Sequence, residues 1–578
     1  MKKLIKNLSL LTKKFKTSLV LIIFLQIAVT FAELISIGVL FPLINVMSSE
    51  EKLLDYLVIL EKNSLIINET FKNFILKNII IISCLFITLI FLIKNIFCVA
   101  VSWYQSSFVL RLKYHLSDIL FSNYLEMPHN FYLKNNTAYL IRNTGFVNYS
   151  AQVIESLLKM SSELIIAIAL SIFLIFISPG ASIKILILFL LIFIIIYSLT
   201  KNRLKSLGNT IKETEVHRIK TLKDSFELNR EIKITNSQKY FLKNYLDSLN
   251  RQNKAIFFSR IFSIANRYVI ETILVIAAML YAYSIFLNDT DFISSLPFLV
   301  VLAAVGLRLF PSLNRILGLA QFIRTYYSMV DQLSDELITT SKDKYNYSSK
   351  IKKIDIKKNI KLKNICQKFK DKKFEMNNLN IDFFENKPSF IFGPTGSGKT
   401  TLLNILLGFV KPQSGNVLID DKTISENNVG SIFLSVGYVP QEILIFEDTI
   451  LRNILIGRDE KTIDSQFLKK ILKLTLLDEF LKSLPDGINT IVGERGLNIS
   501  GGQRQRIGLA RALINDPKII ILDEATNSLD KSSEEKIIQN IINFSRNKIL
   551  IMVSHNTNSP HNEFRIIKVN NGEISFIK

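Results

Sequence analysis

Residues 393–400 read Gly-Pro-Thr-Gly-Ser-Gly-Lys-Thr, which matches the pattern GxxxxGK[ST] of a phosphate-binding loop. An apolar, strand-like stretch, Ser389–Phe392, precedes this loop, and a helix-like stretch, Thr401–Leu407, follows it. In this arrangement the backbone amides of residues 394–399 are expected to surround phosphate groups, and the dipole of the following helix adds to the attraction. The stretch therefore predicts a nucleotide-binding α/β domain.

Two side chains of the phosphate-binding loop have defined roles in this pattern. Lys399 is expected to reach the β and γ phosphates of the nucleotide, and the hydroxyl of Thr400 is expected to bind Mg²⁺. A glycine-rich turn without a ligand is the alternative interpretation. It explains neither the spacing of the loop nor the further motifs downstream.

Composition divides the chain of 578 residues into two parts. Residues 1–330 contain long runs of Leu, Ile, Val and Phe, whereas residues 345–578 alternate polar and apolar segments as a soluble α/β domain does. The formal net charge of +22 invites a nucleic-acid-binding interpretation. However, the basic residues gather before the first apolar run and in loops between later runs, which is the positive-inside pattern of a membrane protein. We therefore expect a membrane-embedded protein with no nucleic-acid partner.

Six apolar segments are long enough to cross a bilayer as helices, which requires about 20 residues. They are, in chain order, Ser18–Met47, Phe74–Ser106, Val153–Ser178, Ile183–Thr200, Ile256–Leu287 and Ile293–Leu319. The basic N-terminus and the Lys- and Arg-rich loops 107–152 and 201–255 should be cytoplasmic. Segment 48–73 and the turns at 179–180 and 289–291 should be external.

Further motifs downstream of the loop narrow the class of nucleotide-binding protein. Ile499-Ser500-Gly501-Gly502-Gln503 lies beside a basic helix-like segment, and Lys518–Leu522 reads as a buried strand that ends in Asp523 and Glu524. Two adjacent acids at a strand end could cap a helix instead, but that explains neither the apolar run before them nor Ser528-Leu529-Asp530 after them. Ser-Gly-Gly-Gln beside a basic helix is typical of ABC-type ATPases. Together with the membrane-spanning half, these motifs make the chain resemble the ABC exporters over nearly its whole length.

The resemblance implies roles for the residues near the hydrolysed phosphate. Asp523 would hold Mg²⁺ through water, and Glu524 would be the general base that orients or deprotonates the attacking water. Gln441, after Tyr438-Val439-Pro440, matches the glutamine that contacts Mg²⁺ and senses the membrane domain. His555 matches the histidine at the γ-phosphate, although a lone histidine at a strand end usually has a structural role.

The resemblance also implies the residues that bind ATP. Ser500 and Gly502 would close over the ATP held by another subunit, with the N-terminus of their helix aimed at its γ-phosphate. Phe369 is the candidate for stacking on adenine, Phe374 is the second candidate, and a core position is the alternative for this aromatic. The expected ATP-binding residues are Phe369, Gly393, Pro394, Thr395, Gly396, Ser397, Gly398, Lys399, Thr400, Thr401, Ser500, Gly501, Gly502, Gln503 and Asp530, with Mg²⁺ at Thr400, Gln441 and Asp523.

The same resemblance implies the organisation of the chain. A six-span α-helical transmembrane domain would occupy residues 1–330, a linker 331–358, and an α/β P-loop ATPase domain with helical and antiparallel β subdomains 359–578. One chain carries one phosphate-binding loop and one Ser-Gly-Gly-Gln signature, which face away from each other in this family, so two ATPase domains are needed. Because all the ATPase motifs of this chain are intact, we expect a homodimer. We expect it in the cytoplasmic (inner) membrane, with the ATPase domain in the cytoplasm.

In this family, short helices at the tips of the two long cytoplasmic loops dock on the ATPase domains. Phe131–Asn136 matches the first of these coupling elements and Ser225–Ile232 the second. An ordinary amphipathic surface helix is the alternative for either one. Thr490–Gly496 resembles an element particular to exporters, in which Glu494 and Arg495 would contact the partner's coupling helix.

Charged residues inside the apolar spans give a clue to the cargo, because each costs about 2.5–3.5 kcal/mol on insertion and usually marks a pathway or an internal pair. Arg308 and Arg315 are seven residues apart and therefore share one helical face. In a dimer such cations would suit an anionic, pyrophosphate-bearing amphiphile. The alternative is internal pairing, for example of Arg267 with Glu271. The charged residues in question are Glu33, Lys94, Arg267, Glu271, Arg308 and Arg315.

Short motifs around these residues resemble the bacterial lipid-linked oligosaccharide flippases. They are Glu33 with Phe41–Ile44, and the segment Arg308–Arg315. Arg267, Arg308 and Arg315 fall on matching basic positions, and Lys94 replaces an arginine. We predict a flippase for a lipid-linked oligosaccharide or related polysaccharide intermediate. The alternatives are an exporter of hydrophobic drugs, lipids or peptides, and an ATP-gated channel or regulator that does not pump.

Overall fold

The structure is a computed structural model that describes residues 2–39, 69–177, 179–287, 292–343, 356–368, 375–424, 429–493, 499–555 and 563–577. The chain divides into two compact units. The first unit comprises Met1–Leu125 and Asn135–Asp343, and the second comprises Glu126–Lys134 and Lys344–Lys578. We describe each unit by itself.

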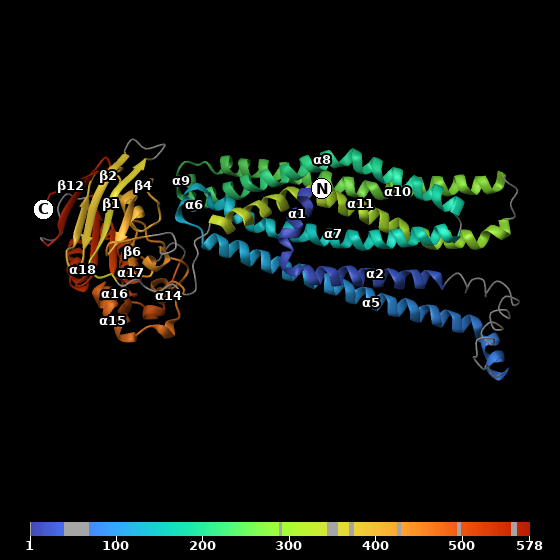
Figure 1. Ribbon diagram of the computed structural model, residues 1–578, viewed down its shortest axis with the longest axis horizontal. Coiled ribbons are helices and arrows are strands. Elements are labelled where there is room, and N and C mark those ends of the chain that lie inside the picture. The colour runs from blue at the N-terminus through green and yellow to red at the C-terminus, as the bar shows by residue number, and fades with distance from the viewer. Residues whose placement is uncertain are drawn as a thin grey trace. The chain divides into compact units, whose positions relative to one another are not determined.

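The first unit consists of long helices (Figure 1). Helix α2 lies along α5, while α7, α8, α10 and α11 run alongside one another. Short helices precede α2 and connect α8 with α10. The bounds are α1 (Lys2–Leu11), η1 (Lys13–Phe15), α2 (Lys16–Gly38), α5 (Glu69–Leu125), α7 (Thr137–Ile177), α8 (Pro179–Glu227), α9 (Asn229–Ile234), α10 (Gln238–Leu287) and α11 (Phe292–Asp343).

Three of these helices contain segments long and apolar enough to cross a membrane: Lys13–Ser36, Leu85–Leu125 and Thr137–Phe173. These segments overlap the first three predicted spans. The other three predicted spans lie in α8, α10 and α11, which include side chains outside the described part of the chain, so the number of six spans stays a prediction. The loop at 48–73, apart from its last residues, and the turn at 289–291 also lie outside the described residues.

The two long cytoplasmic loops predicted from sequence are mostly helical. Helix α5 extends to Leu125 and α7 begins at Thr137, so only a short connection remains between them. The second loop is formed by the end of α8, by α9 and by the start of α10. Helix α11 continues to Asp343, so the first residues of the segment predicted as a linker, 331–358, are helical.

The short helix α6 (His129–Lys134) lies between α5 and α7 in sequence but packs with the second unit. Its His129 ring lies 5.2 Å from the ring of Phe409, at an angle of 40°. Phe409 follows helix α12 (Lys399–Leu406), which continues directly from the phosphate-binding loop. The segment predicted as the first coupling element, Phe131–Asn136, therefore overlaps a helix that contacts the domain carrying that loop.

The second unit is built on a six-stranded sheet in the order β12-β11-β3-β10-β9-β6. All neighbouring strands pair in parallel except β12, which pairs antiparallel with β11. The central strands are continuous apolar runs, because parallel strands are covered on both faces. The bounds are β3 (Ser389–Phe392), β6 (Val436–Val439), β9 (Ile519–Asp523), β10 (Ile549–Ser554), β11 (Arg565–Asn570) and β12 (Glu573–Phe576).

A four-stranded antiparallel sheet and a helical region complete this unit, as expected for the two subdomains. The sheet has the order β2-β1-β4-β5, and a further two-stranded ribbon joins β7 to β8. These strands are β1 (Asn359–Lys368), β2 (Glu375–Phe384), β4 (Ser414–Ile419), β5 (Lys422–Thr423), β7 (Asp448–Thr449) and β8 (Ile491–Val492). The remaining helices are α13 (Val429–Phe433), α14 (Ile450–Leu455), η2 (Glu460–Thr462), α15 (Ser465–Leu474), α16 (Leu477–Lys482), η3 (Gly487–Asn489), α17 (Gly501–Leu513) and α18 (Lys531–Phe544).

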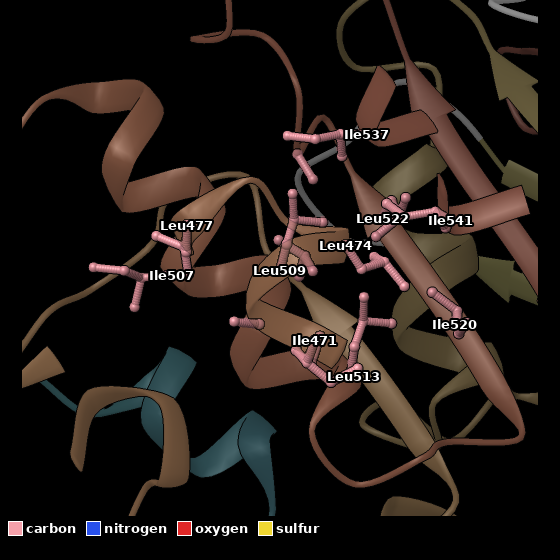
Figure 2. Packing of buried hydrophobic residues seen from close by; sticks show 14 of the residues in the cluster. Ile471, Leu474, Leu477, Ile507, Leu509, Leu513, Ile520, Leu522, Ile537 and Ile541 are labelled. Carbon is pink, nitrogen blue, oxygen red and sulfur yellow. The ribbon is translucent and has the colours of Figure 1, made fainter. Parts of the chain in front are cut away.

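One hydrophobic core joins the helical region to the sheet (Figure 2). Ile520 and Leu522 of β9 pack with Leu509 and Leu513 of α17, and Ile471 of α15 belongs to the same cluster. All five side chains are at most 1% exposed. Because this core fixes both β9 and α17, it positions the acidic residues at the end of β9 and the signature residues at the start of α17.

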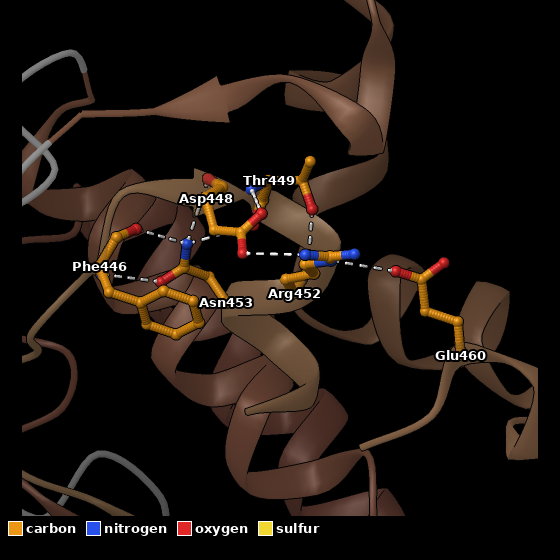
Figure 3. Close-up of polar contacts among 6 residues, drawn as sticks. All are labelled: Phe446, Asp448, Thr449, Arg452, Asn453 and Glu460. Carbon is orange, nitrogen blue, oxygen red and sulfur yellow. Dashed lines mark hydrogen bonds and ion pairs between the residues drawn. The ribbon is translucent and has the colours of Figure 1, made fainter. Parts of the chain in front are cut away.

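A buried asparagine holds the turn that leads into α14 (Figure 3). The Asn453 side chain is fully buried; its amide nitrogen donates to the carbonyl oxygens of Phe446 at 2.9 Å and Thr449 at 3.1 Å. Its side-chain oxygen accepts from the backbone N–H of Phe446 at 3.1 Å. Arg511 Nε donates to the backbone carbonyl of Asn453 at 2.9 Å, which ties the turn to α17.

Replacing Asn453 by Ala should therefore destabilise the protein by about 2–4 kcal/mol, because several buried backbone groups lose their partners. The measurement is the melting temperature of the full-length protein in detergent. Arg452→Ala is the matched control on the same helix, since Arg452 is largely exposed and its ion pairs with Asp448 and Glu460 are long, at 3.4 and 3.5 Å. Equal melting temperatures for the two variants would contradict this role of Asn453.

Candidate functional site

The phosphate-binding loop connects the end of β3 to the start of α12, as the motif predicts. Gly398 caps the helix with φ = 108°, a left-handed conformation that favours glycine. Gly393 lies so close to the neighbouring strand β11 that a Cβ atom would come within 2.1 Å of the Val569 carbonyl oxygen. The loop therefore needs glycine at both positions to fold over the sheet edge.

Lys399 lies inside this loop. Its Nζ donates to the carbonyl oxygens of Gly393 at 2.7 Å and Pro394 at 3.1 Å, and it lies 3.3 Å from His555 Nδ1. Burial lowers the pKa of the Lys399 ammonium group, and the nearby carboxylates of Glu524 and Asp523 oppose this effect. The ammonium group is thus held at the mouth of the loop, where a phosphate would meet it.

The parallel sheet brings the other candidate catalytic residues to the same edge. Glu524 follows β9, which lies between β10 and β6, and His555 and Gln441 follow these two neighbours. His555 Nε2 lies 2.5 Å from Glu524 Oε1, and Gln441 Nε2 donates to Glu524 Oε2 at 2.9 Å. The structure thus places the three predicted catalytic side chains in one hydrogen-bonded cluster.

Glu524 is held in an unusual backbone conformation. Its φ of 53° lies in the left-handed region, which is uncommon for a residue other than glycine and is often found at functional sites. Its backbone N–H donates to the Val553 carbonyl of β10 at 3.0 Å, and the residue is only 6% exposed. This conformation turns the carboxylate out of the line of the strand and toward His555 and Gln441.

Two residues that the sequence interpretation did not select also contact the acids. Asn527 Nδ2 donates to Glu524 Oε2 at 3.2 Å, and the Tyr438 hydroxyl donates to Asp523 Oδ2 at 3.4 Å. Asn527 lies between Glu524 and the motif Ser528-Leu529-Asp530. Its position three residues after the acid at the strand end is the feature of the sequence that could have identified it. Tyr438 lies on β6 next to β9, so only the strand order reveals its contact.

The oxygen atoms near the loop fit Mg²⁺. This ion prefers carboxylate, hydroxyl and amide oxygens together with substrate phosphates and water, rather than a cage made only of protein. Thr400, Gln441 and Asp523 offer such oxygens, and Ser397 Oγ is buried without a hydrogen-bond partner among the described residues. Burial raises the pKa of Asp523, and the adjacent Glu524 carboxylate adds to this effect. A cation here would relieve the repulsion between the two acids.

The signature residues cap helix α17. Ser500 Oγ accepts from the Gln503 N–H at 3.2 Å, and Gln503 Oε1 accepts from the Ser500 N–H at 2.8 Å, which is a capping box. A Cβ atom on Gly502 would lie 3.1 Å from the Ser528 carbonyl oxygen. The Ser532 hydroxyl and the Ser533 N–H both donate to the Asp530 carboxylate, which caps α18, and these hydrogen bonds lower the pKa of this carboxyl group.

The signature and the phosphate-binding loop do not meet within the chain. In the part that the structure describes, no hydrogen bond or ion pair joins Ser500–Gln503 to residues 393–400. Four residues with roles implied by resemblance fall outside the described residues: Phe369, Phe374, Glu494 and Arg495. Their assignments stay predictions. Of the expected loop residues, Pro394, Thr395, Gly396 and Thr400 are exposed, and Thr401 is buried.

The candidate substrate arginines of the first unit have acidic partners. Arg308 Nη2 lies 2.9 Å from Glu33 Oε1 on α2, and Arg308 Nε donates to Glu33 Oε2 at 3.0 Å. Arg315 Nη1 lies 2.7 Å from Glu163 Oε1 on α7. Glu163 was not selected from sequence, although a carboxylate inside an apolar span is itself a signal of function.

The other two candidate substrate residues have different surroundings. Arg267 is exposed, and no ion pair joins it to Glu271 within the described part of α10. Lys94 is half-buried, and its ammonium group lies 4.7 Å from the centre of the Phe91 ring. Internal pairing thus involves Arg308 and Arg315 rather than Arg267.

Comparison with known proteins identifies the second unit. Residues 376–527 match the family model of the ABC transporter. A putative export ATP-binding/permease protein of Rickettsia typhi is 40% identical over 199 residues, which is 34% of this chain and 34% of that protein. The leukotoxin translocation ATP-binding protein LktB of Mannheimia haemolytica is 37% identical over 229 residues, or 39% of this chain and 32% of that protein. These matches thus span about a third of the length of each relative.

The whole chain can be compared with a solved structure. A bacterial Atm1-family ABC exporter with ATP bound matches with a TM-score of 0.75 and 19% identity, covering 97% of this chain and 94% of that one. The chain therefore has the fold of an ABC exporter, and its second unit is an ABC-type ATPase domain. The prediction of this fold and of an ATPase domain is confirmed. The matches do not test the resemblance to lipid-linked oligosaccharide flippases.

Proposed function

We propose that this protein is an ATP-driven exporter of the cytoplasmic (inner) membrane that works as a homodimer with its ATPase domain in the cytoplasm. The observation that carries the proposal is the intact cluster of Lys399, Gln441, Glu524 and His555 in a chain with the exporter fold. A channel or regulator that does not pump would not need this complete set. Hydrolysis of ATP without coupled transport would favour that alternative.

The residues of the cluster divide the work of hydrolysis. ATP with Mg²⁺ supplies the phosphoryl group whose transfer to water drives the cycle, and Thr400, Gln441 and Asp523 would hold the metal. Lys399 neutralises phosphate charge at the mouth of the loop. Glu524 orients and deprotonates the attacking water, while His555 contacts the γ-phosphate. In such sites most of the rate enhancement comes from positioning and charge stabilisation.

The separation of the two ATP-contacting motifs supports the proposed homodimer. Within one chain Ser500–Gln503 is capped on its own helix and makes no described contact with the loop 393–400. A second copy can supply the missing signature to each loop. The α9 helix overlaps the predicted second coupling element, and two exposed apolar side chains lie beside and on it: Phe226 at the end of α8 is 75% exposed, and Ile234 at the end of α9 is 84% exposed. These side chains are suited to docking on an ATPase domain.

The proposed cargo is a lipid-linked oligosaccharide or a related polysaccharide intermediate. Support comes from the motifs around Glu33 and Arg308–Arg315 and from the cations Lys94, Arg267, Arg308 and Arg315 on apolar helices. The names of the relatives include both a permease and a leukotoxin translocator, so similarity in the ATPase domain does not select a cargo. An exporter of hydrophobic drugs, lipids or peptides is therefore the second candidate.

The double variant Arg308→Ala/Arg315→Ala should lower glycolipid flipping by about tenfold or more, since each lost charged hydrogen bond costs about 1.5–3 kcal/mol. Basal ATP hydrolysis should change much less, because the ATPase motifs are untouched. The two single effects should be non-additive if both side chains hold one headgroup. Lys at both positions should restore part of the flipping, because charge survives without bidentate geometry.

The assay measures flipping of a fluorescent polyprenyl-linked oligosaccharide in proteoliposomes, with ATP hydrolysis and melting temperature recorded in parallel. Arg324→Ala is the control on the same helix; Arg324 donates to the Lys201 carbonyl instead of a carboxylate. Unchanged flipping by the folded double variant would mean that the two arginines serve structure. No flipping of any such lipid by the unmodified protein, together with export of a neutral or cationic drug, would favour the second candidate.

A further inference from the structure

Two buried carboxylates lie against the candidate substrate arginines. The Glu33 carboxylate pairs with Arg308: its Oε1 lies 2.9 Å from Arg308 Nη2, and its Oε2 accepts a hydrogen bond from Arg308 Nε at 3.0 Å. The Glu163 carboxylate accepts hydrogen bonds from Arg315 Nη1 at 2.7 Å and from the Ser312 hydroxyl at 2.6 Å. Arg308, Ser312 and Arg315 follow each other at helical spacing on α11, so they form one polar face, which we call the arginine face.

Burial is uneven within these pairs. The side chains of Glu33 and Glu163 are 8% and 11% exposed, whereas those of Arg308 and Arg315 are 24% and 53% exposed. A guanidinium group has five N–H donors in a fixed fork, and one carboxylate engages at most part of it. The arginines can therefore be approached by a second anion from their exposed sides, while the carboxylates lie behind them.

The two carboxylates belong to a joint surface made by α2 and α7. Gln26 on α2 donates to the Leu158 carbonyl of α7 at 2.8 Å, and its side-chain oxygen accepts from Ser161 at 2.9 Å. These contacts tie α2 to α7 without the arginines. The acids thus stay near the arginine face even when an ion pair opens, and they act as local competitors for any external anion.

We propose that Glu33 and Glu163 are resident counter-anions that an incoming anionic headgroup must replace at Arg308 and Arg315. The inference rests on the proposed function and deepens it, since it assigns charge selectivity to two acidic residues. A headgroup replaces the two acids only if it neutralises the positive charge of both guanidinium groups at once. The site therefore selects a diphosphate-bearing amphiphile over neutral, zwitterionic or singly charged ones.

The distance between the arginines fits this selectivity. Seven residues of α-helix span about 10 Å along the axis, at 1.5 Å per residue. Two long arginine side chains can converge on a diphosphate across this distance, and guanidinium groups bind phosphate oxygens in bidentate fashion. A single carboxylate or phosphate monoester would reach one arginine and leave the other with its resident acid.

The two acids should compete unequally. Glu163 keeps the Ser312 hydroxyl when Arg315 leaves, and Arg315 is the more exposed cation. Glu33 is the more buried acid and contacts Arg308 through two nitrogens. Removing a buried charge partner costs more than removing an exposed one. Glu33 should therefore be the stronger competitor of the two.

The experiment replaces the acids by their amides in the full-length protein in nanodiscs. The probe is a polyprenyl pyrophosphate, and the readout is the concentration that half-saturates the change in ATP hydrolysis. Glu33→Gln should lower this concentration by about fivefold or more, the lower end of typical coupling between two sites. Glu163→Gln should lower it less, and Ser312→Ala, which removes the donor that Glu163 keeps when Arg315 leaves, should raise it slightly.

Two controls separate competition from general loosening of the helices. Glu155→Gln removes an acid of α7 that pairs with Lys159 at the surface, and it should leave the half-saturating concentration unchanged. The neutral probe polyprenol should change the ATP hydrolysis of the unmodified protein and of the variants with the same half-saturating concentration. The proposal is overturned if Glu33→Gln leaves the pyrophosphate response unchanged or weakens it, or if polyprenol shows the same shift.

The outcomes also distinguish this inference from the proposed cargo. If the unmodified protein responds to no polyprenyl pyrophosphate, the assay is repeated with dodecyl diphosphate as a probe without a polyprenyl chain. Tighter binding of this probe by Glu33→Gln would uphold the counter-anion role while the lipid-linked cargo fails. If Glu33→Gln does not fold, Ser312→Ala decides the question, and an unchanged response of this variant to both diphosphate probes overturns the proposal.

Discussion

Replacing Glu524 by Gln should lower ATP turnover by about 10²- to 10⁴-fold, the usual contribution of a general base. The amide has nearly the same shape as the carboxylate. It can still face Gln441 and His555, which contact the two carboxylate oxygens at 2.9 and 2.5 Å. It cannot accept a proton from water. ATP binding should therefore survive, and ATP-bound dimers should accumulate.

The measurement combines steady-state hydrolysis with nucleotide binding by the purified protein in nanodiscs. Glu479→Gln is the control, because Glu479 is an exposed acid on α16 of the same domain. The control should hydrolyse ATP at the unmodified rate. Near-normal turnover by Glu524→Gln would remove Glu524 from the role of base and direct attention to Asp523.

Replacing Lys399 by Ala should weaken productive ATP binding by about 100-fold, because charged hydrogen bonds to two phosphates contribute about 1.5–3 kcal/mol each. The structure adds a second effect. Lys399 Nζ also bonds to the carbonyls of Gly393 and Pro394, so its loss loosens the loop itself. Nucleotide binding is measured with a fluorescent ATP analogue. Lys422→Ala, an exposed lysine of β5, is the control.

Mixed dimers extend this test to the assembly. A Lys399→Ala chain paired with a Ser500→Arg chain leaves one composite ATP site intact and places both defects in the other site. Such dimers should keep part of the hydrolytic activity, whereas dimers with both changes in every chain should keep none. Full activity of a protein shown to be monomeric in nanodiscs would refute the composite site.

The local motifs of the ATPase domain could be predicted because each depends on a few consecutive residues. The loop 393–400, the apolar strand before Asp523 and the capping residue Ser500 all occupy the local structures that their patterns predict. Glycine spacing, strand hydrophobicity and capping act over one turn or one strand, so no knowledge of distant residues is needed.

The contacts of Asp523 and Glu524 depend on the order of the strands in the sheet. Tyr438 meets Asp523 only because β6 and β9 are neighbours in the sheet, and Asn527 meets Glu524 because the chain turns back after β9. The left-handed backbone of Glu524 is also set by the sheet edge, through its bond to Val553. A linear pattern carries no information about such neighbours.

The sequence by itself determined a nucleotide-binding loop, its partner motifs and a long apolar half, since these follow from local composition and spacing. Only the tertiary structure decided which acid neutralises which arginine. Arg308 meets Glu33 across 275 residues of chain, and Arg315 meets Glu163 across 152. Helical spacing had suggested Arg267 with Glu271 instead. Ion pairs in a helical bundle are chosen by how the helices pack side by side, and that packing depends on contacts spread over their whole length.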